Sequence, residues 1–380
     1  MNFEKNYTPP CNKFVIQIHL SFGNNITKEE TMDYVRISER MTGFTNQIIL
    51  LASAIVSAAN HRSNVVVVQA FLDNIHTSNY SPISQILNLE ATNVFLKEQY
   101  NLIVADRSNV VFELVSVFYG NPSSFFDVTD FIKAKCLRNN RLGISKQLDF
   151  NLIRGDPCVG TPKTILIHYK VNGHLFTRNF LAANRKGDIT LNMDGPYKLP
   201  IQYPLDISFP AYDPIIKSLV FNPTILQYAN QVISRIDASK KINVIHLRME
   251  PDAISHWSKQ NRITEAAFEQ SLQQNYIDFI TQYISPEEET IVLSASLSNG
   301  VIDFLEKNHY RYRFVDKFFQ GREKNAIVDL LVSRMCNNVF LGNGGSTFSM
   351  YVSKMMAEPC RTTLYINLNN LKEAPIVVKR

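Results

Sequence analysis

Hydrophobic and polar residues alternate along the first half of the chain in the periods typical of strands and helices. Short runs rich in β-branched residues predict strands at 14–20 and 64–69, and the apolar segment 45–60 between them predicts a buried helix. A strand, a helix and a second strand of this length are typical of the βαβ unit of a parallel sheet.

From residue 224 onward the alternation becomes more regular. Apolar strands are predicted at 242–247, 290–293, 312–315, 339–341 and 363–366. Helices are predicted before and between them at 224–236, 264–284, 299–308, 326–336 and 346–357. Strands that alternate with helices in this way predict a doubly wound α/β domain.

The two regular regions are joined by less regular sequence. Residues 121–210 contain only two strand-like runs, at 164–169 and 187–191. Their basic residues between Lys133 and Lys146 are interpreted as a solvated surface, with an acceptor-binding face as the alternative.

A proline-rich segment at 199–222, which includes Pro200 and Pro204, follows the irregular region. Proline removes a backbone donor and disfavours helix at the residue before it, so this segment is expected to connect two domains. We therefore predict an N-terminal domain over 1–211 and a C-terminal domain over 212–380, both Rossmann-like and facing a cleft.

Composition narrows the class of protein. The 380 residues are 45% hydrophobic and 19% charged, which excludes disorder as the main state. A net charge of +5 permits an anionic ligand but does not favour nucleic acid as a partner. The five cysteines form no CxxC and predict reduced thiols rather than a metal site or a disulfide framework.

No export signal or transmembrane segment is evident in the sequence. The N-terminus has no apolar core, and the most apolar stretch, 48–59, is shorter than the roughly 20 residues that span a bilayer. We expect a cytoplasmic protein; the alternative is a lumenal catalytic domain, if a membrane anchor has been trimmed.

The first candidate for chemistry follows the predicted strand 242–247. His246, Arg248 and Glu250 are two residues apart, so they share a face while the chain stays extended, and Pro251 is expected to end the strand. At the carboxyl end of such a strand an arginine can bind a phosphate. The alternative is a structural ion pair of Arg248 with Glu250 or Asp252 and a histidine satisfied in the core.

The second candidate is the glycine-rich segment 339–348, in which a strand runs into glycines and then into a helix with Ser346 or Thr347 near its start. Backbone N–H groups at a helix N-terminus favour an anion. The alternative is a plain tight turn. Two anion sites at strand ends of one domain would suit a diphosphate.

Two further candidates for the functional site give weaker signals when each is taken by itself. The segment 40–47 opens the first helix with Gly43, Asn46 and Gln47, and an ordinary helix cap is the alternative. Asp329 lies in the predicted helix before 339–341 and could contact a purine or a ribose. The alternative is an acid in the first turn of a helix, where the helix dipole favours a negative charge.

Taken in order, these segments resemble the motifs of the protein O-fucosyltransferase superfamily, including its plant branch and, more remotely, the α1,6-fucosyltransferases. Residues 246–252, His-Leu-Arg-Met-Glu-Pro-Asp, look like the HLRxExD motif of that group. Residues 40–47 are similar to its N-terminal glycine–asparagine–glutamine motif, and 329–348 to its C-terminal block.

The resemblance implies a GT-B-type fold, with the nucleotide sugar held mainly by the C-terminal domain and the acceptor by the N-terminal one. It implies GDP-fucose as the donor, inversion at the sugar carbon, a glycan or protein hydroxyl as acceptor, and neither a cofactor nor a metal. Arg248 would bind the diphosphate and stabilise the leaving group, His246 would contact the nucleotide or ribose, and Asp329 would hold the guanine.

The remaining carried-over residues complete the expected site. Ser346, Thr347 and Phe348 would hold the phosphates and the base. Asn46 and the backbone at Gly43 and Phe44 would close the site. Glu250 and Asp252 would orient Arg248.

The chain departs from the family at one position that matters for catalysis. Some members carry a carboxylate general base just before the Gly-Phe-Asn element, where this sequence has Thr42, with Glu39 further back. The residue that acts as general base is therefore not assigned, and a mechanism without a strong base is an alternative. Two further alternatives are an enzyme that uses a different donor sugar and a catalytically silent binding module. A Rossmann dehydrogenase is disfavoured because no GxGxxG with a downstream acid is found.

Overall fold

The computed structural model describes residues 34–37, 43–60, 63–68, 70–74, 79–106, 110–138, 141–182, 188–192, 207–356, 362–373 and 376–379. Met32–Arg380 form one compact unit, and a first unit, Met1–Thr31, lies wholly outside the described residues. The predicted strand at 14–20 lies outside them too, as do Glu39, Thr42, Pro200 and Pro204.

The N-terminal half contains the predicted βαβ unit. Strands β1 (Tyr34–Ile37) and β2 (Val65–Val68) are parallel and joined by helix α1 (Phe44–Asn60), and β5 (Ile103–Asp106) pairs with the other edge of β2. Helix α2 (Leu89–Tyr100) precedes β5. The short elements between β2 and α2 are β3 (Phe71–Asn74), β4 (Asn79–Ser81) and η2 (Ile83–Gln85).

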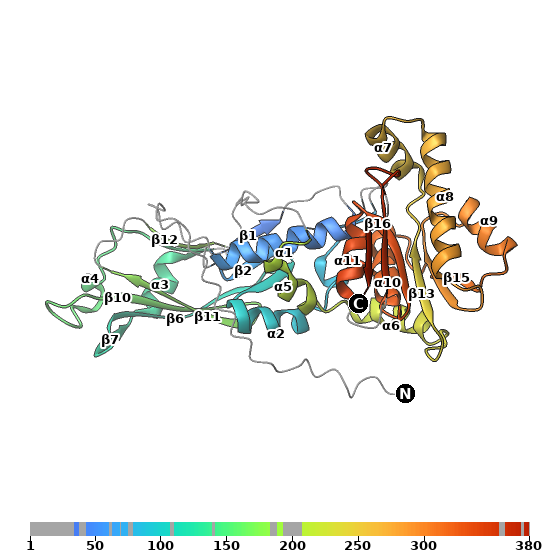
Figure 1. Cartoon of the computed structure of the whole chain (residues 1–380). Helices are drawn as coiled ribbons and strands as arrows, with labels where there is room; N and C mark the ends of the chain where they lie inside the picture. The colour runs from blue at the N-terminus through green and yellow to red at the C-terminus, as the bar shows by residue number, and fades with distance from the viewer. Residues whose placement is uncertain are drawn as a thin grey trace. The chain divides into compact units, whose positions relative to one another are not determined.

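The irregular middle of the sequence folds as antiparallel sheet, which the sequence analysis did not anticipate beyond two strands (Figure 1). A four-stranded sheet has the order β11-β10-β6-β7, and a three-stranded sheet has the order β12-β9-β8. Their strands and the two nearby helices are β6 (Phe112–Asn121), β7 (Ser124–Asp127), α3 (Thr129–Cys136), β8 (Leu137–Arg138), β9 (Arg141–Ile144), α4 (Asn151–Arg154), β10 (Thr164–Val171), β11 (His174–Leu181) and β12 (Ile189–Asn192).

Alternating side chains divide the N-terminal half into two cores. Val66 and Val68 of β2 point into the core that contains α1, whereas Val65 and Val67 belong to the core of the antiparallel strands. Every second residue of β10 is buried in the latter core, as expected for strands with one covered face.

The C-terminal half confirms the predicted doubly wound α/β architecture. Its sheet has the order β15-β14-β13-β16-β17-β18, and all pairs are parallel except the last. The strands are β13 (Ile242–His246), β14 (Glu289–Leu293), β15 (Tyr312–Phe314), β16 (Val339–Gly344), β17 (Thr362–Asn367) and β18 (Ile376–Lys379).

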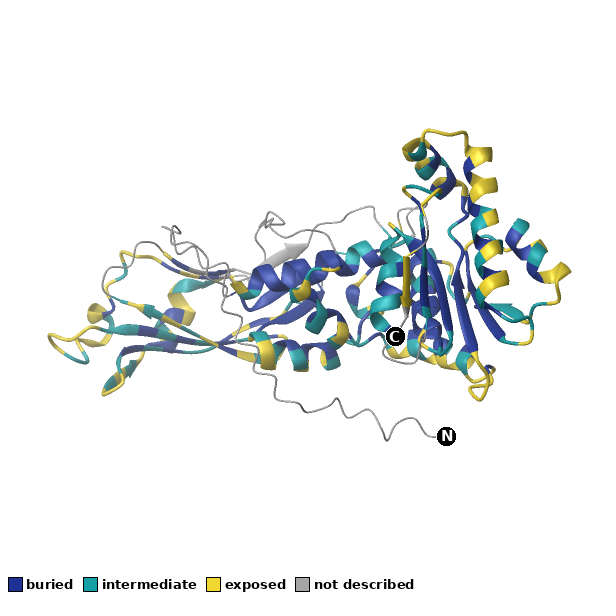
Figure 2. Cartoon of the chain, in the orientation of Figure 1, coloured by how far each residue is buried: buried dark blue, intermediate teal, exposed yellow. Residues whose placement is uncertain are grey.

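Helices cover both faces of this sheet, which explains why β13 is buried along its whole length (Figures 1 and 2). Ile245 packs into a cluster with α7 (Pro251–Asn261), α8 (Glu265–Tyr283) and α9 (Gly300–Lys307). Val244, its neighbour, packs into the cluster on the opposite face. The helices of that cluster include α1, α6 (Pro223–Ile233), α10 (Arg322–Ser333) and α11 (Thr347–Met355).

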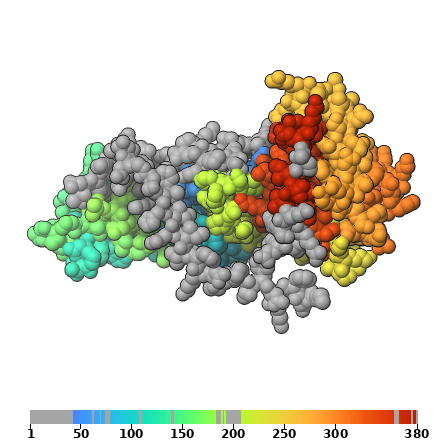
Figure 3. Space-filling view, viewed as in Figure 1, coloured from blue at the N-terminus to red at the C-terminus, as the bar shows by residue number. Residues whose placement is uncertain are grey.

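The described part of the proline-rich segment contains two short helices. It forms η4 (Pro210–Tyr212) and α5 (Asp213–Ser218), and Pro210 and Pro214 occupy first-turn positions where a missing N–H breaks no helical bond. Asp213 of α5 pairs with Lys354 of α11, and the two segments adjoin at the surface (Figure 3).

One hydrophobic cluster extends across the predicted domain boundary. Phe44 of α1, Tyr212 of η4 and Val328 of α10 all belong to it. The division into 1–211 and 212–380 stays a prediction, but its two sides share a core, so the chain on one side positions residues on the other.

Three sequence expectations concern membrane spans, thiols and the basic stretch. None of the helices within the described ranges is both long and apolar enough to cross a bilayer. Cys136, Cys158 and Cys336 are free thiols. Lys133, Lys135 and Lys146 of the basic stretch are exposed to solvent, as a solvated surface requires.

Candidate functional site

The strand order of the C-terminal sheet predicts where a ligand binds. The chain leaves β13 toward β14 and β15 on one side, and returns to place β16 and β17 on the other. In open α/β sheets, ligands bind at such a switch point, beyond the carboxyl ends of the strands. A cavity of about 350 Å³ lies there, a volume within the usual range of small-molecule sites.

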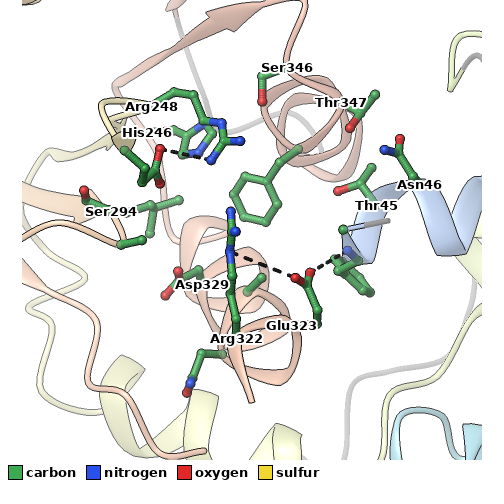
Figure 4. Close-up of a pocket in the computed structure, with 18 of the residues that line it drawn as sticks. Thr45, Asn46, His246, Arg248, Ser294, Arg322, Glu323, Asp329, Ser346 and Thr347 are labelled. Atoms are coloured by element: carbon green, nitrogen blue, oxygen red, sulfur yellow. Dashed lines mark hydrogen bonds and ion pairs between the residues drawn. The ribbon is translucent and has the colours of Figure 1, made fainter. Parts of the chain in front are cut away.

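The cavity gathers the residues that the sequence predicts to bind a donor or to orient Arg248, but not Gln47, whose side-chain amide bonds to the backbone of Leu72. Its lining includes Gly43, Phe44, Asn46, His246, Arg248, Glu250, Asp252, Asp329, Ser346, Thr347 and Phe348. These residues come from three segments far apart in the sequence, and Figure 4 labels members of each, among them Asn46, Arg248 and Thr347. Their convergence is an observation, whereas their roles stay predictions.

Arg248 lies just beyond the carboxyl end of β13 and forms ion pairs with two carboxylates. Its Nη1 lies 3.0 Å from Glu250 Oε2, and its Nη2 lies 3.4 Å from Asp252 Oδ2. The strand ends at His246, four residues earlier than Pro251 suggests, and α7 starts at Pro251. The expectation that the strand runs on to Glu250 is therefore wrong, and ion pairs rather than strand geometry orient the guanidinium.

A buried network joins the ends of β13 and β16 behind Arg248. The Tyr276 hydroxyl accepts the N–H of Arg248 at 3.0 Å and lies 2.8 Å from both His246 O and Asn343 Oδ1. Asn343 Nδ2 also donates to His246 O, at 2.9 Å. The fully buried ring of Tyr276 thus fixes the backbone from which Arg248 projects.

His246 is a neutral residue in this environment. Burial lowers its pKa to about 3, and the positive charges of Arg248 and Arg322 act in the same direction. Its Nδ1 lies 2.7 Å from Ser349 Oγ, which also accepts the N–H of Asn343 at 2.9 Å. At neutral pH the ring can contribute a hydrogen bond to a ligand but not a charge.

The glycine-rich segment forms more strand than predicted. β16 continues through Gly344, and only Gly345, with φ of 89°, has the left-handed backbone of a turn. A Cβ on Gly342 would lie 2.8 Å from the Phe340 ring, so this strand position needs glycine for close packing. Ser346 then caps α11, as predicted.

The start of α11 faces the cavity. Ser346, Thr347 and Phe348 all line it, and the Phe348 ring packs against His246 with centroids 4.9 Å apart. The first N–H groups of a helix and its dipole favour an anion at this place.

Asp329 lies in the middle of α10, because that helix begins at Arg322 rather than at 326. The interpretation of Asp329 as a first-turn acid is therefore wrong. Its two carboxylate oxygens lie 3.0 and 3.2 Å from Lys317 Nζ. Burial raises the pKa of Asp329, and Lys317 opposes that shift.

The N-terminus of α1 meets the start of α10 on the side of the cavity away from Arg248. The backbone N–H of Phe44 donates to Glu323 Oε2 at 2.6 Å, so a protein carboxylate already occupies this donor. The Phe44 ring is 1% exposed and packs against Phe71, Phe221 and Tyr351. That this backbone closes the site over a donor stays a prediction.

The sequence analysis missed several polar residues of the lining. Arg322 and Glu323 open α10 in a stretch of ordinary surface composition, and Lys317 stands in a loop. Their only local signal is a cluster of charges at a helix start, which is common on surfaces. The missed polar residues are Thr45, Ser294, Lys317, Arg322, Glu323 and Asn325.

The described residues contain no group of three or more histidine, cysteine, aspartate or glutamate side chains that could hold a metal ion. The positive groups of the lining are instead Arg248, Lys317 and Arg322.

Comparisons with known proteins gave matches in structure only. No family model matches the chain, and no curated protein matches its sequence. Fucosyltransferase NodZ from Bradyrhizobium is 12% identical, with a TM-score of 0.46 over 91% of this chain and 98% of that one. POFUT1 in complex with GDP-fucose is 14% identical, with a TM-score of 0.47 over 88% and 98% of the two chains.

Proposed function

We propose that this chain is a glycosyltransferase that transfers fucose from GDP-fucose to a hydroxyl of a glycan or protein, with inversion and without a metal. The observation that carries the proposal is the convergence of three motif segments on one cavity at the switch point of the C-terminal sheet. These segments are the ones that resemble the protein O-fucosyltransferase superfamily, and they are separated by about 200 and 80 residues in the sequence.

The pair of Asp329 and Lys317 supports guanine as the base. The Watson–Crick edge of guanine offers two donors beside one acceptor. A carboxylate can accept both N–H groups, and an ammonium can donate to O6. Adenine presents a different pattern, so the same pair would leave charged groups unmatched. Lys317 is partly exposed, which leaves it free to adjust to a base.

Arg248, Arg322 and the start of α11 support a diphosphate. Both guanidinium groups line the cavity and both lower the pKa of His246, so their positive charges act on the same region. Ser346 and Thr347 add the N-terminal end of a helix. Together these groups can neutralise the charge that a departing GDP gains as the bond to the sugar breaks.

In this mechanism Arg248 is the residue that contributes most to stabilising the leaving group. The transition state places positive charge on the sugar and negative charge on the leaving diphosphate. A guanidinium held in place by Glu250 and Asp252 needs little reorganisation when that charge develops. The Tyr276 network fixes the backbone beneath it.

Calorimetry with GDP, GDP-fucose, GDP-mannose, ADP and UDP-glucose tests the donor. GDP and GDP-fucose are expected to bind, and ADP is expected to bind at least tenfold more weakly. Binding of another nucleotide with no response to GDP would refute the donor assignment. Binding of GDP-fucose without any release of GDP would favour the silent binding module.

Asp329→Asn is expected to weaken GDP binding by at least tenfold, because the amide offers one acceptor and no charge to the two guanine donors. Asp316→Asn is the matched control, since Asp316 pairs with Arg235 at a half-exposed site outside the cavity lining. Equal GDP affinity of Asp329→Asn and the wild type would exclude this residue from base recognition.

A further inference from the structure

Glu323 is a buried carboxylate whose two oxygens have different surroundings. Oε2 accepts the N–H of Phe44 at 2.6 Å, whereas Oε1 is buried and has no hydrogen-bond partner within the described part of the chain. Its nearest cation, Arg322 Nε, is 4.0 Å away. The residue is only 3% exposed and lines the cavity (Figure 4). Leaving a buried carboxylate oxygen unbonded is costly unless a ligand completes it.

Thr45 provides a second, independent sign of a missing ligand group. Its Oγ1 is buried and has no hydrogen-bond partner among the described residues. It follows Phe44 in α1, so it lies beside the backbone that Glu323 contacts, and it lines the same cavity. A hydroxyl and a carboxylate oxygen, on two helices that meet at the cavity and both without a hydrogen-bond partner among the described residues, together match a hydroxyl-bearing ligand.

The charges that face Glu323 come from each element packed around it. Arg322 stands beside it on α10, Asp73 approaches from β3, and Arg248 acts from beyond β13. Asp73 itself pairs with Lys324 at 3.1 Å. Burial raises the pKa of Glu323; Asp73 adds to the shift, whereas the Phe44 N–H and the two arginines oppose it. Such a carboxylate is a stronger base than an exposed glutamate.

We propose that Glu323 is the general base that accepts the proton of the acceptor hydroxyl, with Thr45 orienting that hydroxyl. The inference rests on the proposed glycosyl transfer. As the acceptor oxygen forms its bond to the sugar carbon, its proton passes to Glu323 Oε1. The bond from that carbon to the diphosphate oxygen breaks, and its electron pair leaves with GDP. Glu323 then returns the proton to solvent.

The position of this carboxylate answers a question that the sequence left open. Where some members of the resembled family carry a base before the Gly-Phe-Asn element, this chain has Thr42. Glu323 contacts the backbone of that same element at Phe44, although it comes from a helix 279 residues further along the chain. Tertiary structure therefore supplies a carboxylate next to this element.

The test substitution is Glu323→Gln, whose amide oxygen can still accept the Phe44 N–H while its side chain can no longer accept a proton. GDP release from GDP-fucose, with water as the acceptor, is measured from pH 5 to 9 alongside calorimetric GDP affinity. GDP affinity is expected to stay within threefold, and GDP release to fall at least 100-fold. Glu306→Gln, at an exposed site on α9, is the matched control.

The pH dependence of GDP release distinguishes a general base from a structural residue, because a structural role would not change it. The base form of Glu323 is lost as pH falls through its raised pKa. Wild-type release should therefore decline on the acid side at a pH above the ordinary glutamate pKa of 4.5. Glu323→Gln should lack this acid limb. Because the ionised form is disfavoured in the folded state, the variant should also melt no lower than wild type at pH 8.

The outcomes separate this inference from the proposed function. If the wild type does not bind GDP, the proposed function fails. If GDP binds but Glu323→Gln releases GDP as fast as wild type, only the inference fails. Parallel loss of GDP affinity and thermal stability would reduce Glu323 to a structural cap of α1. A wild type that binds GDP-fucose but never releases GDP would favour the silent binding module, which refutes the proposed transfer itself.

Discussion

Arg248→Ala is expected to lower the turnover of GDP-fucose on the order of 10³-fold while the chain stays folded. Arg248 is the guanidinium held between Glu250 and Asp252 at the switch point, and its charge is needed most when the diphosphate departs. Arg248→Lys should recover only part of the loss, because an ammonium cannot present two donors in a fixed plane.

Steady-state release of GDP measures this effect, and circular dichroism with thermal melting checks the fold. The matched control is Arg235→Ala, since Arg235 also forms an ion pair with an aspartate, Asp316, but at a half-exposed site outside the cavity lining. Turnover of Arg248→Ala within tenfold of wild type, in a folded protein, would overturn the assignment of Arg248 to the leaving group.

Tyr276→Phe is expected to lower the free energy of unfolding by about 2–4 kcal/mol. The hydroxyl accepts the Arg248 N–H and contacts His246 O and Asn343 Oδ1, so its removal leaves buried polar groups with too few partners. The ring itself is retained, so the cost comes from hydrogen bonds rather than from a cavity.

Urea denaturation measures this loss, with Tyr312→Phe as the control. Tyr312 donates to Glu306 near the surface, so removing its hydroxyl should cost less than about 1 kcal/mol. We also expect reduced turnover in Tyr276→Phe, because the backbone of Arg248 loses its anchor. Equal stability of the two tyrosine variants would show that the network contributes little to holding the switch point.

Much of the C-terminal half could be predicted from the sequence because its signals are local. The buried run of β13 and the alternation of strands with helices report burial on both faces of a sheet. Segments such as 246–252 and 342–348 follow strand ends directly, so the topology alone places them at one edge. Their residues therefore line the cavity as the strand order requires.

Element boundaries failed where tertiary contacts overrode local pattern. β13 ends at His246, where its pairing with β14 ends, and β16 extends through Gly344 because β17 pairs with it along its length. The antiparallel sheets were missed although one hairpin has a local signal, since Asn172-Gly173 joins β10 to β11 as a two-residue turn with both φ angles positive.

The sequence by itself determined the α/β class, the chemical character of the site and most of the residues that line it, since periodicity and motif spacing are properties of neighbouring residues. Only the tertiary structure decided which charges meet. Glu323 reaches Phe44, and Lys317 pairs with Asp329, through loop and helix positions with no local signature. A buried charge is recognisable by its burial and its partner, and both come into existence only when distant segments pack together.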